Sequence, residues 1–294
     1  MTRIDIVMPV WNAGRYLDET LGMLSRQTHT NFRLVAVDDG SSDDSPRILQ
    51  EWKRRKLFDL HVITQENRGV AAARNQGLAA ISEPLIALLD ADDIWHPIKL
   101  ALQVKYLDHR GEVQAVGCAY ETWSQKPHAR SVSVNFHWGR DAVKSWATFR
   151  GRGPLLPSTL ALRTAILDSV GVFDDDLSTA ADLEFAARLV ANHEVNSLEE
   201  VLVRYRIHGS QMHLSSQALM RDYMVLANDA DFRHSLGLSR EEMLASYAAY
   251  LAAKASRECR LPEAIRYARR AWRLDPGVTM SVLSASARRA TRLG

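Results

Sequence analysis

The sequence is poor in cysteine, and it lacks the long apolar runs that mark membrane and secreted proteins. Its two cysteines, Cys118 and Cys259, stand far apart in 294 residues and form no CxxC pair, which excludes a disulfide scaffold and a zinc ribbon. No stretch approaches the roughly 18 consecutive apolar residues of a membrane-spanning helix. Met1–Val10 lacks the apolar segment and the cleavage site of a signal peptide. We therefore expect a cytosolic (cytoplasmic) protein.

A large excess of either charge is also missing. The formal net charge is +2 and 24% of the residues are charged, so the composition gives no reason to expect a nucleic-acid partner. The basic residues are nevertheless uneven, since 266–294 is rich in arginine and holds one acid, Asp275. Such a tail is either a solvated helix face or a surface for anionic lipid or an acidic partner. Peripheral contact with the inner face of a membrane therefore stays open.

Apolar runs and helical periods alternate through the first hundred residues. The runs expected as strands are Ile4–Val10, Phe32–Val37, Leu60–Ile63 and Leu85–Leu89. Strands that alternate with helical patterns predict a mostly parallel sheet with helices on both faces. No GxGxxG follows the first run, which disfavours a dinucleotide dehydrogenase.

The middle and the end of the chain have different patterns. Further strands are expected at Gln114–Tyr120, Ser131–Phe136, Ser158–Leu162 and Val201–Arg206, and a helix at Ala181–Ala191. Beyond about Ser215 only helical patterns recur, near 216–235, 239–258, 262–273 and 279–291. We therefore divide the chain into an α/β domain over 1–215 and a helical extension over 216–294.

Polar residues follow three of the expected strands, at the point where each strand ends. They are Asn12, the Asp38-Asp39-Gly40 turn and the Asp90–Asp93 turn. Parallel sheets bind ligands beyond the carboxyl ends of their strands, so these residues predict a site at one edge. Crowded carboxylates repel one another unless a cation compensates, and hard oxygen ligands suit Mg²⁺ or Mn²⁺. Each turn alone also fits a solvated turn in which an aspartate bonds its own backbone.

The order and spacing of several motifs resemble family 2 glycosyltransferases. The motifs are Pro9-Val10-Trp11-Asn12, Val37-Asp38-Asp39-Gly40-Ser41, Asn67-Arg68-Gly69 with Ala73-Arg74-Asn75, Leu89-Asp90-Ala91-Asp92-Asp93, Val170-Gly171-Val172-Phe173-Asp174, Ala181-Asp182 with Arg188, and Tyr205-Arg206-Ile207-His208. The resemblance runs from about Ile4 to Met212. It implies the GT-A fold, which is a Rossmann-like, mostly parallel sheet flanked by helices, and an enzyme that uses a nucleotide-sugar donor.

The resemblance also implies which residues bind the donor. They are Pro9, Val10, Trp11, Asn12, Asp39, Gly69, Arg74, Asp90 and Asp92. Asp39 would accept a hydrogen bond from a uracil-like base, and Pro9 and Trp11 would wall the base pocket. Arg74 would face the nucleotide. Family members often carry Tyr or Phe where Trp11 stands. Without the resemblance, Trp11 fits a core aromatic equally well and Arg74 fits a surface salt bridge.

A metal site is implied by the same resemblance, because Asp90 and Asp92 form the family's DxD motif. One of these two aspartates, with Asp92 favoured over Asp90, would bind a divalent cation, Mn²⁺ or Mg²⁺, and the other would contact ribose. Asp93 is expected to share the ligand shell of the metal. His208 matches a position that contacts metal or diphosphate in parts of the family, although a lone histidine is more often a hydrogen-bonded structural residue.

Sugar transfer with inversion needs a base that takes the proton of the acceptor hydroxyl. The resemblance implies that Asp182, six residues before Arg188, is this base. Ala181 replaces the first acid of a pair that the family often carries. Asp182 also fits the start of the helix Ala181–Ala191 as a simple cap. A raised pKa in an apolar surround would favour the catalytic role.

The helical extension contains one segment, Ala248 to Pro276, that resembles a tetratricopeptide-type hairpin. The matching residues are Tyr250, Ala253, Ala264, Tyr267, Ala268, Ala271, Leu274 and Pro276. One such unit cannot bury its apolar face alone. We therefore expect it to pack on the α/β domain or to support self-association.

The sequence thus predicts an inverting, metal-dependent hexosyl- or related transferase of surface glycan or glycoconjugate biosynthesis. A UDP-sugar is favoured as the donor, and the acceptor would be a glycan, a lipid-linked sugar or a protein side chain. Ala181 and the long tail leave an alternative open, namely a non-catalytic nucleotide-sugar-binding protein or a scaffold that acts through its helical tail. A receiver-type signalling module fits less well, because it needs a lysine after a late strand and a chain of about 120 residues.

Overall fold

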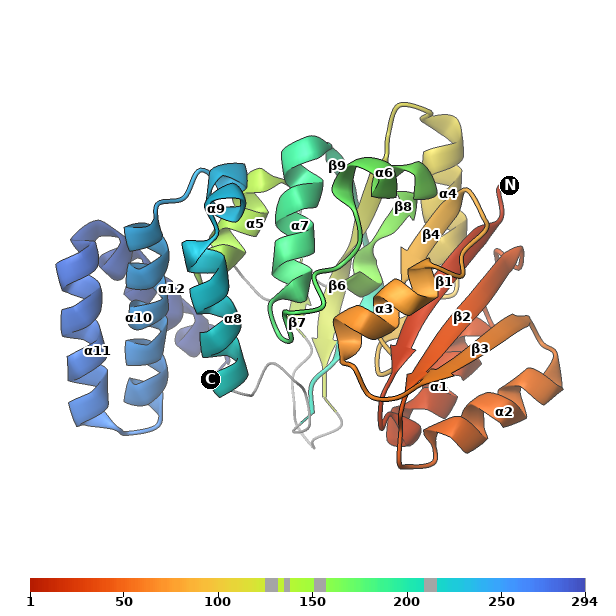
Figure 1. Cartoon of the computed structure of the whole chain (residues 1–294), viewed down its shortest axis with the longest axis horizontal. Helices are drawn as coiled ribbons and strands as arrows, with labels where there is room; N and C mark the ends of the chain where they lie inside the picture. The colour runs from red at the N-terminus through yellow and green to blue at the C-terminus, as the bar shows by residue number, and fades with distance from the viewer. Residues whose placement is uncertain (125–131, 135–137, 151–156, 209–215, 294) are drawn as a thin grey trace.

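The computed structural model describes residues 1–124, 132–134, 138–150, 157–208 and 216–293. They form one curled sheet with helices on both faces and a group of further helices at one end (Figure 1). The strands lie in the order β3-β2-β1-β4-β8-β6-β9-β5, with β7 beside β6. The predicted α/β class with a helical C-terminal segment is confirmed.

The N-terminal half of the sheet is parallel, as predicted. β1 (Ile4–Val10) pairs with β2 (Phe32–Asp39) and with β4 (Leu85–Leu88), and β2 pairs with β3 (Asp59–Gln65). Because Val10 lies opposite Asp38 in this register, β1 and β2 end at the same edge of the sheet. The polar residues that follow these strands therefore meet there.

The other half of the sheet is mixed. Its strands are β5 (Ile94–Trp95), β6 (Ala115–Trp123), β7 (Val132–Val134), β8 (Ala161–Arg163) and β9 (Val195–Arg206). β8 lies antiparallel between β4 and β6, whereas β9 runs parallel to β6 and antiparallel to β5. This arrangement ties the segment after Asp90 to the end of β9.

Two of the expected strands differ from the structure. The strand expected at Ser158–Leu162 is confirmed only in its last residues, because Pro157–Thr159 forms a short 3-10 helix and β8 begins at Ala161. Ser158 adopts this turn while its hydroxyl accepts a hydrogen bond from the Asp90 N–H and its carbonyl accepts one from the Trp95 indole. The strand expected at Ser131–Phe136 is described only over its β7 part, and its remaining residues lie outside the described ranges.

Each face of the sheet has its own set of helices. One face is covered by α1 (Gly14–Leu24), α2 (Ser45–Arg55) and α4 (Lys99–His109), and the other by α3 (Val70–Leu78), α5 (Arg140–Ala147), α6 (Leu167–Val170) and α7 (Ala181–Asn192). In β1, Ile6 and Met8 pack toward the first set and Val7 toward the second, as in a strand buried on both faces. The small residues of α3 let it approach closely, since a Cβ on Gly77 would stand 2.5 Å from Val7 Cγ1.

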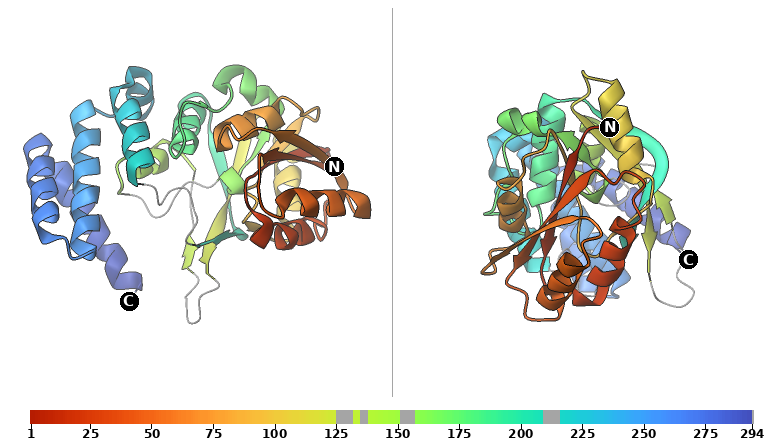
Figure 2. Two further views of the ribbon diagram at one scale, coloured as in Figure 1. Left: turned by 60° about the horizontal axis from the view of Figure 1, so that its bottom comes forward. Right: turned by 90° about the vertical axis from the view of Figure 1, so that its right-hand side faces the viewer.

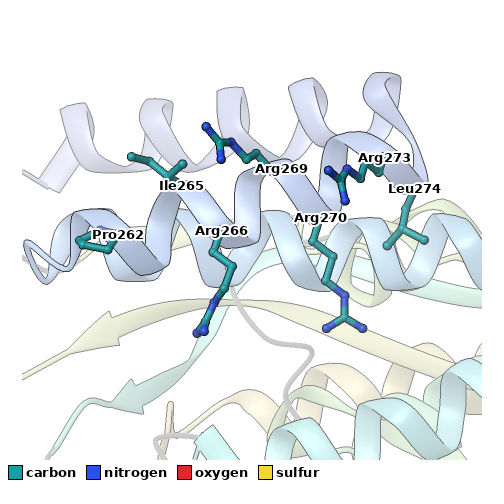
Figure 3. A pocket seen from close by; sticks show the side chains of 7 residues that line it. All are labelled: Pro262, Ile265, Arg266, Arg269, Arg270, Arg273 and Leu274. Atoms are coloured by element: carbon teal, nitrogen blue, oxygen red, sulfur yellow. The ribbon is translucent and has the colours of Figure 1, made fainter.

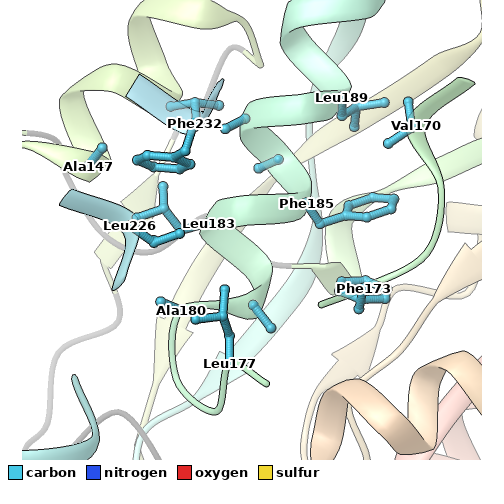
Figure 4. Close-up of a cluster of buried hydrophobic side chains, with 14 of the residues drawn as sticks. Ala147, Val170, Phe173, Leu177, Ala180, Leu183, Phe185, Leu189, Leu226 and Phe232 are labelled. Carbon is cyan, nitrogen blue, oxygen red and sulfur yellow. The ribbon is translucent and has the colours of Figure 1, made fainter. Parts of the chain in front are cut away.

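The helical extension consists of α8 (Ser216–Asn228), α9 (Ala230–Leu236), α10 (Arg240–Arg257), α11 (Leu261–Leu274) and α12 (Pro276–Leu293). The one helix expected near 216–235 is two, because Asp229 caps a new helix with its side chain. Leu226 of α8 and Phe232 of α9 pack beside Leu183 of α7 (Figure 4). The first helices of the extension therefore share the core of the sheet domain. The boundary expected near Ser215 lies outside the described residues.

The last three helices stand at the end of the molecule away from β3 and α2 (Figures 1 and 2). Alanines of α10 and α11 pack with Val278 and Val282 of α12 in a small core of their own. Over the described part of the chain, no helix has the length and the apolarity that crossing a membrane requires.

Candidate active site

The loop after β1 and the loop after β2 are joined by hydrogen bonds. The side-chain oxygen of Asn12 accepts from the Ser42 N–H at 2.8 Å, and the Asn12 N–H donates to Ser41 Oγ at 3.0 Å. Asn12 has φ of 48°, a left-handed conformation that asparagine tolerates better than most residues. The two loops predicted to form one edge are thus held together.

Asp39 organises the segment that leads into α3. One carboxylate oxygen accepts from Gln65 Nε2 at 2.7 Å and from the Arg68 N–H at 2.8 Å, and the other accepts from the Gly69 N–H at 2.9 Å. The neighbouring Gly40 has φ of 70°, and a Cβ there would stand 2.8 Å from the Asn67 nitrogen. Glycine is therefore required next to Asp39. A contact between Asp39 and a base stays a prediction.

The residues expected around the donor base differ in exposure. Trp11 is 54% exposed at the end of β1, so it is not the core aromatic that the sequence left open. Pro9 is half-buried, whereas Val10 is fully buried in the core. Of the three, Trp11 offers the largest surface to a ligand.

Arg74 joins two of the predicted site carboxylates. Its guanidinium is buried, with 2% of the side chain exposed, and donates to Asp90 at 2.7 Å and to Asp182. It also stacks over the Phe173 ring, 5.1 Å from the centroid. Burial alone lowers the pKa of Arg74, but attraction to Asp182 and Asp90 outweighs burial and raises this pKa. Arg74 is therefore a buried hub and not one half of a surface salt bridge.

Asp182 is placed by the first turn of α7. Its side chain does not cap the helix, since no side chain of α7 bonds the first N–H groups and the Asp182 carboxylate binds Arg74. The carboxylate lines a small hollow together with Leu160, Phe173 and Phe185. Burial raises the pKa of Asp182 and outweighs the opposing pull of Arg74, and the nearby Asp90 adds to the rise. The side chain keeps 29% of its surface exposed, so an incoming group can reach it.

Asp92 and His208 lie side by side, although 116 residues separate them. The imidazole Nε2 is 2.8 Å from a carboxylate oxygen of Asp92, and the ring packs against Tyr16 at 4.6 Å between centroids. Arg206, fully buried two residues earlier, donates to the Asp92 carbonyl at 2.9 Å. The end of β9 thus supplies a brace for the acidic turn through Arg206, and the imidazole follows two residues later.

Asp93 points into the protein. Its carboxyl group is fully buried, and one oxygen accepts from the Arg206 N–H at 3.3 Å. Burial, reinforced by the charges of Asp92 and Asp90, holds the pKa of Asp93 well above its usual range. The three aspartates of the turn therefore have different surroundings. Asp90 faces Arg74, Asp92 faces His208, and Asp93 faces the core.

The chemistry of these side chains fits a hard divalent cation. Among the described residues, no group of three or more His, Cys, Asp or Glu side chains is arranged to hold a metal. Asp92 and His208 nevertheless present a carboxylate oxygen and an imidazole nitrogen, both partly exposed, at one point. Mg²⁺ and Mn²⁺ often take one or two protein ligands and complete their shell with substrate phosphates and water. Asp92 and His208 could supply the protein ligands of a cation that is bound in this way.

Sequence reasoning missed Ser158, whose hydroxyl accepts from the Asp90 N–H at 3.0 Å. It also missed Arg206 as a brace for Asp92. Ser158 stands in an apolar run with no local signal, and its role depends on an antiparallel pairing of β8 with β4. Arg206 was part of a motif, and its burial beside Tyr16 and Trp123 is a contact that spacing does not reveal.

Comparison with known proteins gives a consistent picture. The family model described as glycosyl transferase family 2 matches residues 5–152. An uncharacterised glycosyltransferase of Nostoc sp. is 28% identical over 220 residues, which cover 73% of this chain and 67% of the relative. The putative teichuronic acid biosynthesis glycosyltransferase TuaG of Bacillus subtilis is 33% identical over 109 residues, 36% of this chain and 42% of that protein.

Solved structures share the fold. Residues 1–349 of S. aureus TarS, crystallised in complex with UDP-GlcNAc, align with a TM-score of 0.65 at 19% identity, over 97% of this chain and 89% of that one. The mannosyltransferase PcManGT from Pyrobaculum calidifontis, in complex with GDP-Man and Mn²⁺, aligns with a TM-score of 0.60 at 22% identity, over 97% and 86%. At these identities the structures establish the shared GT-A-type architecture alone.

Proposed function

The chain belongs to glycosyl transferase family 2, and from this premise we propose that it transfers a sugar from a nucleotide diphosphate donor to an acceptor hydroxyl, with inversion. The observation that supports this most is the buried arginine hub, in which Arg74 binds both Asp90 and Asp182. It brings the DxD turn and the proposed base, which lie on different elements, to one edge of the sheet. Asp92 of the same turn lies beside His208, which follows β9.

In the proposed reaction Asp182 takes the proton of the acceptor hydroxyl. The acceptor oxygen forms its bond to the anomeric carbon while the bond from that carbon to the diphosphate breaks, and a nucleoside diphosphate leaves. A base is most effective when its pKa lies near the working pH, and the raised pKa of Asp182 moves it in that direction. Arg74 orients the carboxylate of Asp182, and its positive charge offsets the negative charges of Asp182 and Asp90.

The donor is proposed to lie across the loops after β1, β2 and β4. The exposed Trp11 ring and Pro9 would flank the base, and the Asp39–Gly69 segment would contact it. Asp90 would face the ribose. The TarS complex contains UDP-GlcNAc and the PcManGT complex contains GDP-Man, which supports a nucleotide-sugar donor. We favour a UDP-sugar.

Asp92 and His208 are proposed to hold Mn²⁺ or Mg²⁺, with Asp90 and the buried Asp93 beside them. When bound, the cation would neutralise the charge that develops on the departing diphosphate. The Mn²⁺ in the PcManGT complex supports a divalent ion. The acceptor is proposed to be a glycan, a lipid-linked sugar or a protein side chain of surface polysaccharide biosynthesis, and the name of the relative TuaG supports a polysaccharide pathway.

A thermal-shift screen of UDP- and GDP-sugars with and without Mn²⁺ tests the proposal. A donor that binds the folded protein raises the melting temperature by mass action, and we expect a larger rise with Mn²⁺ present. Asp92→Asn should remove the Mn²⁺-linked part of the rise. Asp168→Asn, an exposed aspartate on α6, is the matched control and should keep it.

The rival function is nucleotide-sugar binding without transfer. Ala181, which stands where the family often has an acid, favours it. Release of nucleoside diphosphate from the donor that binds best, measured with and without candidate acceptors, separates the two functions. Binding without any release would support the rival, and no binding across the donor panel would contradict both.

The surface of α11 supports a proposed contact with an anionic membrane. Its exposed side carries four arginines for which the described residues provide no ion pair, namely Arg266, Arg269, Arg270 and Arg273. Figure 3 shows them around a shallow hollow on this helix, with Ile265 beside them. Leu261, Ile265 and Trp272 are each more than half exposed on the same helix. Unpaired guanidinium groups next to exposed apolar side chains match the headgroup region of anionic lipid.

Co-sedimentation with vesicles tests this contact. We expect binding to vesicles that contain phosphatidylglycerol, weaker binding to pure phosphatidylcholine, and loss of binding at high salt. Arg266→Gln with Arg270→Gln should weaken binding, whereas Arg47→Gln with Arg54→Gln on exposed α2 should not. Equal binding by both double variants would contradict the proposal. Self-association that persists without lipid would assign this face to a second copy of the chain instead.

A further inference from the structure

Asp222 of α8 is a fully buried aspartate that binds the chain just ahead of α7. One of its oxygens accepts from the N–H groups of Ser178 at 2.8 Å, Thr179 at 2.6 Å and Ala180 at 3.2 Å. The same oxygen lies 3.1 Å from the Ser178 and Thr179 hydroxyls. The other oxygen accepts from the side chain of Arg221. Apart from the bonds from Arg221, all of these hydrogen bonds come from one short segment, Ser178 to Ala180.

This carboxylate holds the residues that lead into α7. Its backbone bonds end at the N–H of Ala180, the residue directly before the helix, and α7 has no side-chain cap of its own. A negative charge at this end of a helix is also favoured by the helix dipole. Burial alone would raise the pKa of Asp222, but the backbone hydrogen bonds outweigh it and lower this pKa. Asp222 is consequently an ionised carboxylate of the helical extension that fixes the entry to α7.

The stretch that Asp222 binds ends directly before α7, two residues ahead of the proposed base. Ala180 precedes α7, and Asp182 stands in the first turn of the helix. On its other side Asp182 is held by Arg74 of α3. The turn that carries Asp182 is thus fixed from two directions, by an arginine of the sheet domain and by an aspartate of the extension.

The packing of α8 fixes the position of Asp222 along α7. Leu226 lies one helical turn after Asp222 and packs beside Leu183 of α7 (Figure 4). Tyr223 is buried, and its hydroxyl donates to the Ala147 carbonyl of α5. Because α8 cannot slide without breaking these contacts, its carboxylate stays opposite the start of α7.

We propose that Asp222 is a positioning residue that holds Asp182 in line for proton abstraction, so that the helical extension is part of the catalytic apparatus. This rests on the proposed role of Asp182 as the base. It predicts that loss of Asp222 lowers kcat and leaves donor binding intact. A residue with a purely structural role would lower the amount of folded protein without changing the turnover of the folded fraction.

The test compares Asp222→Ala and Asp222→Asn with Asp229→Asn in the full chain. Asp229 caps a helix of the extension, through the Asp231 and Phe232 N–H groups, but this helix is α9 and not α7. The measurements are kcat, the KM for the donor and the donor-induced thermal shift, all per mole of folded protein well below the melting temperature. Asn keeps an oxygen that can accept from the backbone, so it serves as the conservative variant.

We expect Asp222→Ala to lower kcat at least tenfold with a donor KM within about twofold of the wild type. Asp222→Asn should recover part of the lost kcat, and Asp229→Asn should keep all of it. If Asp222→Ala yields no folded protein, a lowered kcat in Asp222→Asn with unchanged donor binding supports the proposal. A wild-type kcat in either Asp222 variant, or an equal loss in Asp229→Asn, overturns it. If Asp182→Asn turns over normally, the assignment of the base has failed and the positioning role of Asp222 fails with it, whereas a wild-type kcat in the Asp222 variants beside an inactive Asp182→Asn overturns the positioning role alone.

Discussion

Arg74 of α3 and Asp182 of α7 form a buried ion pair between positions 108 residues apart. The same guanidinium binds Asp90, so one cation serves two carboxylates that would otherwise repel each other. The pair gives a carboxylate that lies among Phe173 and Phe185 a positive partner, which opposes the rise in its pKa that burial causes. It also makes the proton affinity of Asp182 depend on Arg74.

Arg74→Met should therefore shift the pH dependence of transfer. Arg74 lowers the pKa of Asp182 against the effect of burial, so its loss raises that pKa further. A base works only when deprotonated, and the acid limb of the kcat profile should move to higher pH. We expect kcat at pH 7 to fall by about 100-fold. Arg3→Met, which removes an exposed ion pair with Asp59, is the control and should leave the profile unchanged.

Asp182→Asn should separate binding from chemistry. The amide cannot take a proton, and loss of a general base typically costs about 10²- to 10⁴-fold in rate. Donor binding should persist, because the predicted donor residues lie on other loops. Transfer is followed by release of nucleoside diphosphate, and binding by the thermal shift with Mn²⁺. Full turnover in this variant would show that another group is the base.

Gly40→Ala should damage the loop that carries Asp39. A Cβ at a φ of 70° would stand 2.8 Å from the Asn67 nitrogen. The variant is therefore destabilised both by the left-handed backbone conformation and by a clash with the backbone of Asn67. We expect a loss of unfolding free energy of about 1–3 kcal/mol and weaker nucleotide-sugar binding. Urea denaturation and binding titration measure the two effects. Gly111→Ala, where a Cβ meets nothing within 4 Å, should change neither.

Lys99 should give the protein a pH-dependent stability. Its ammonium group is fully buried, lies 3.7 Å from the Trp95 ring centroid and donates to Gln103 at 2.7 Å. Burial lowers the pKa of Lys99 to about 8, against about 10.4 in an unfolded chain. Between these values the unfolded state binds more protons, so this residue makes the free energy of unfolding rise with pH. Below pH 8 the buried charge of Lys99 lowers the free energy of unfolding by its full amount, about 3 kcal/mol or less.

Lys99→Met should remove that dependence. Urea unfolding of the wild type and the variant at pH 7, 8, 9 and 10 should give a difference that shrinks as the pH rises. The difference is the diagnostic quantity, because burial raises the pKa of the nearby Cys118 to about 11 and its thiol acts in the opposite direction. Lys105→Met on the exposed side of the same helix is the control. Parallel stability curves for Lys99→Met and the wild type would refute the assignment.

Local patterns predicted the parallel half of the sheet well. β1, β2 and β4 are buried apolar runs with polar residues at their carboxyl ends, and both features are visible in consecutive residues. The helix carrying Asp182 was predicted to within one residue of its end at Asn192. The mixed half was not foreseen, because the pairing of Leu85 with Arg163 depends on a register between segments far apart in the chain.

Side-chain partners were harder to predict than strands. The small residues around Arg74 indicated a closely packed helix but not that its guanidinium would be buried between two carboxylates. Asp222 lay in a helix expected merely to pack, and its role depends on where α8 docks. The pairing of Asp92 with His208 has no signal in spacing beyond the family motif. Sequence periodicity indicates local secondary structure, whereas these contacts join residues that only tertiary packing brings together.

The antiparallel pairing of β5 with β9 has a consequence for how the protein is made. Asp92 leaves the ribosome 116 residues ahead of His208, and β9 must emerge before the acidic turn can acquire its imidazole and its brace from Arg206. Contacts between distant segments form late, because the chain between them has to be ordered first. A nascent chain that stops short of β9 has the first four strands but not the Asp92–His208 pair. The Asp92–His208 pair is therefore completed only after β9 and the two residues beyond it have been made.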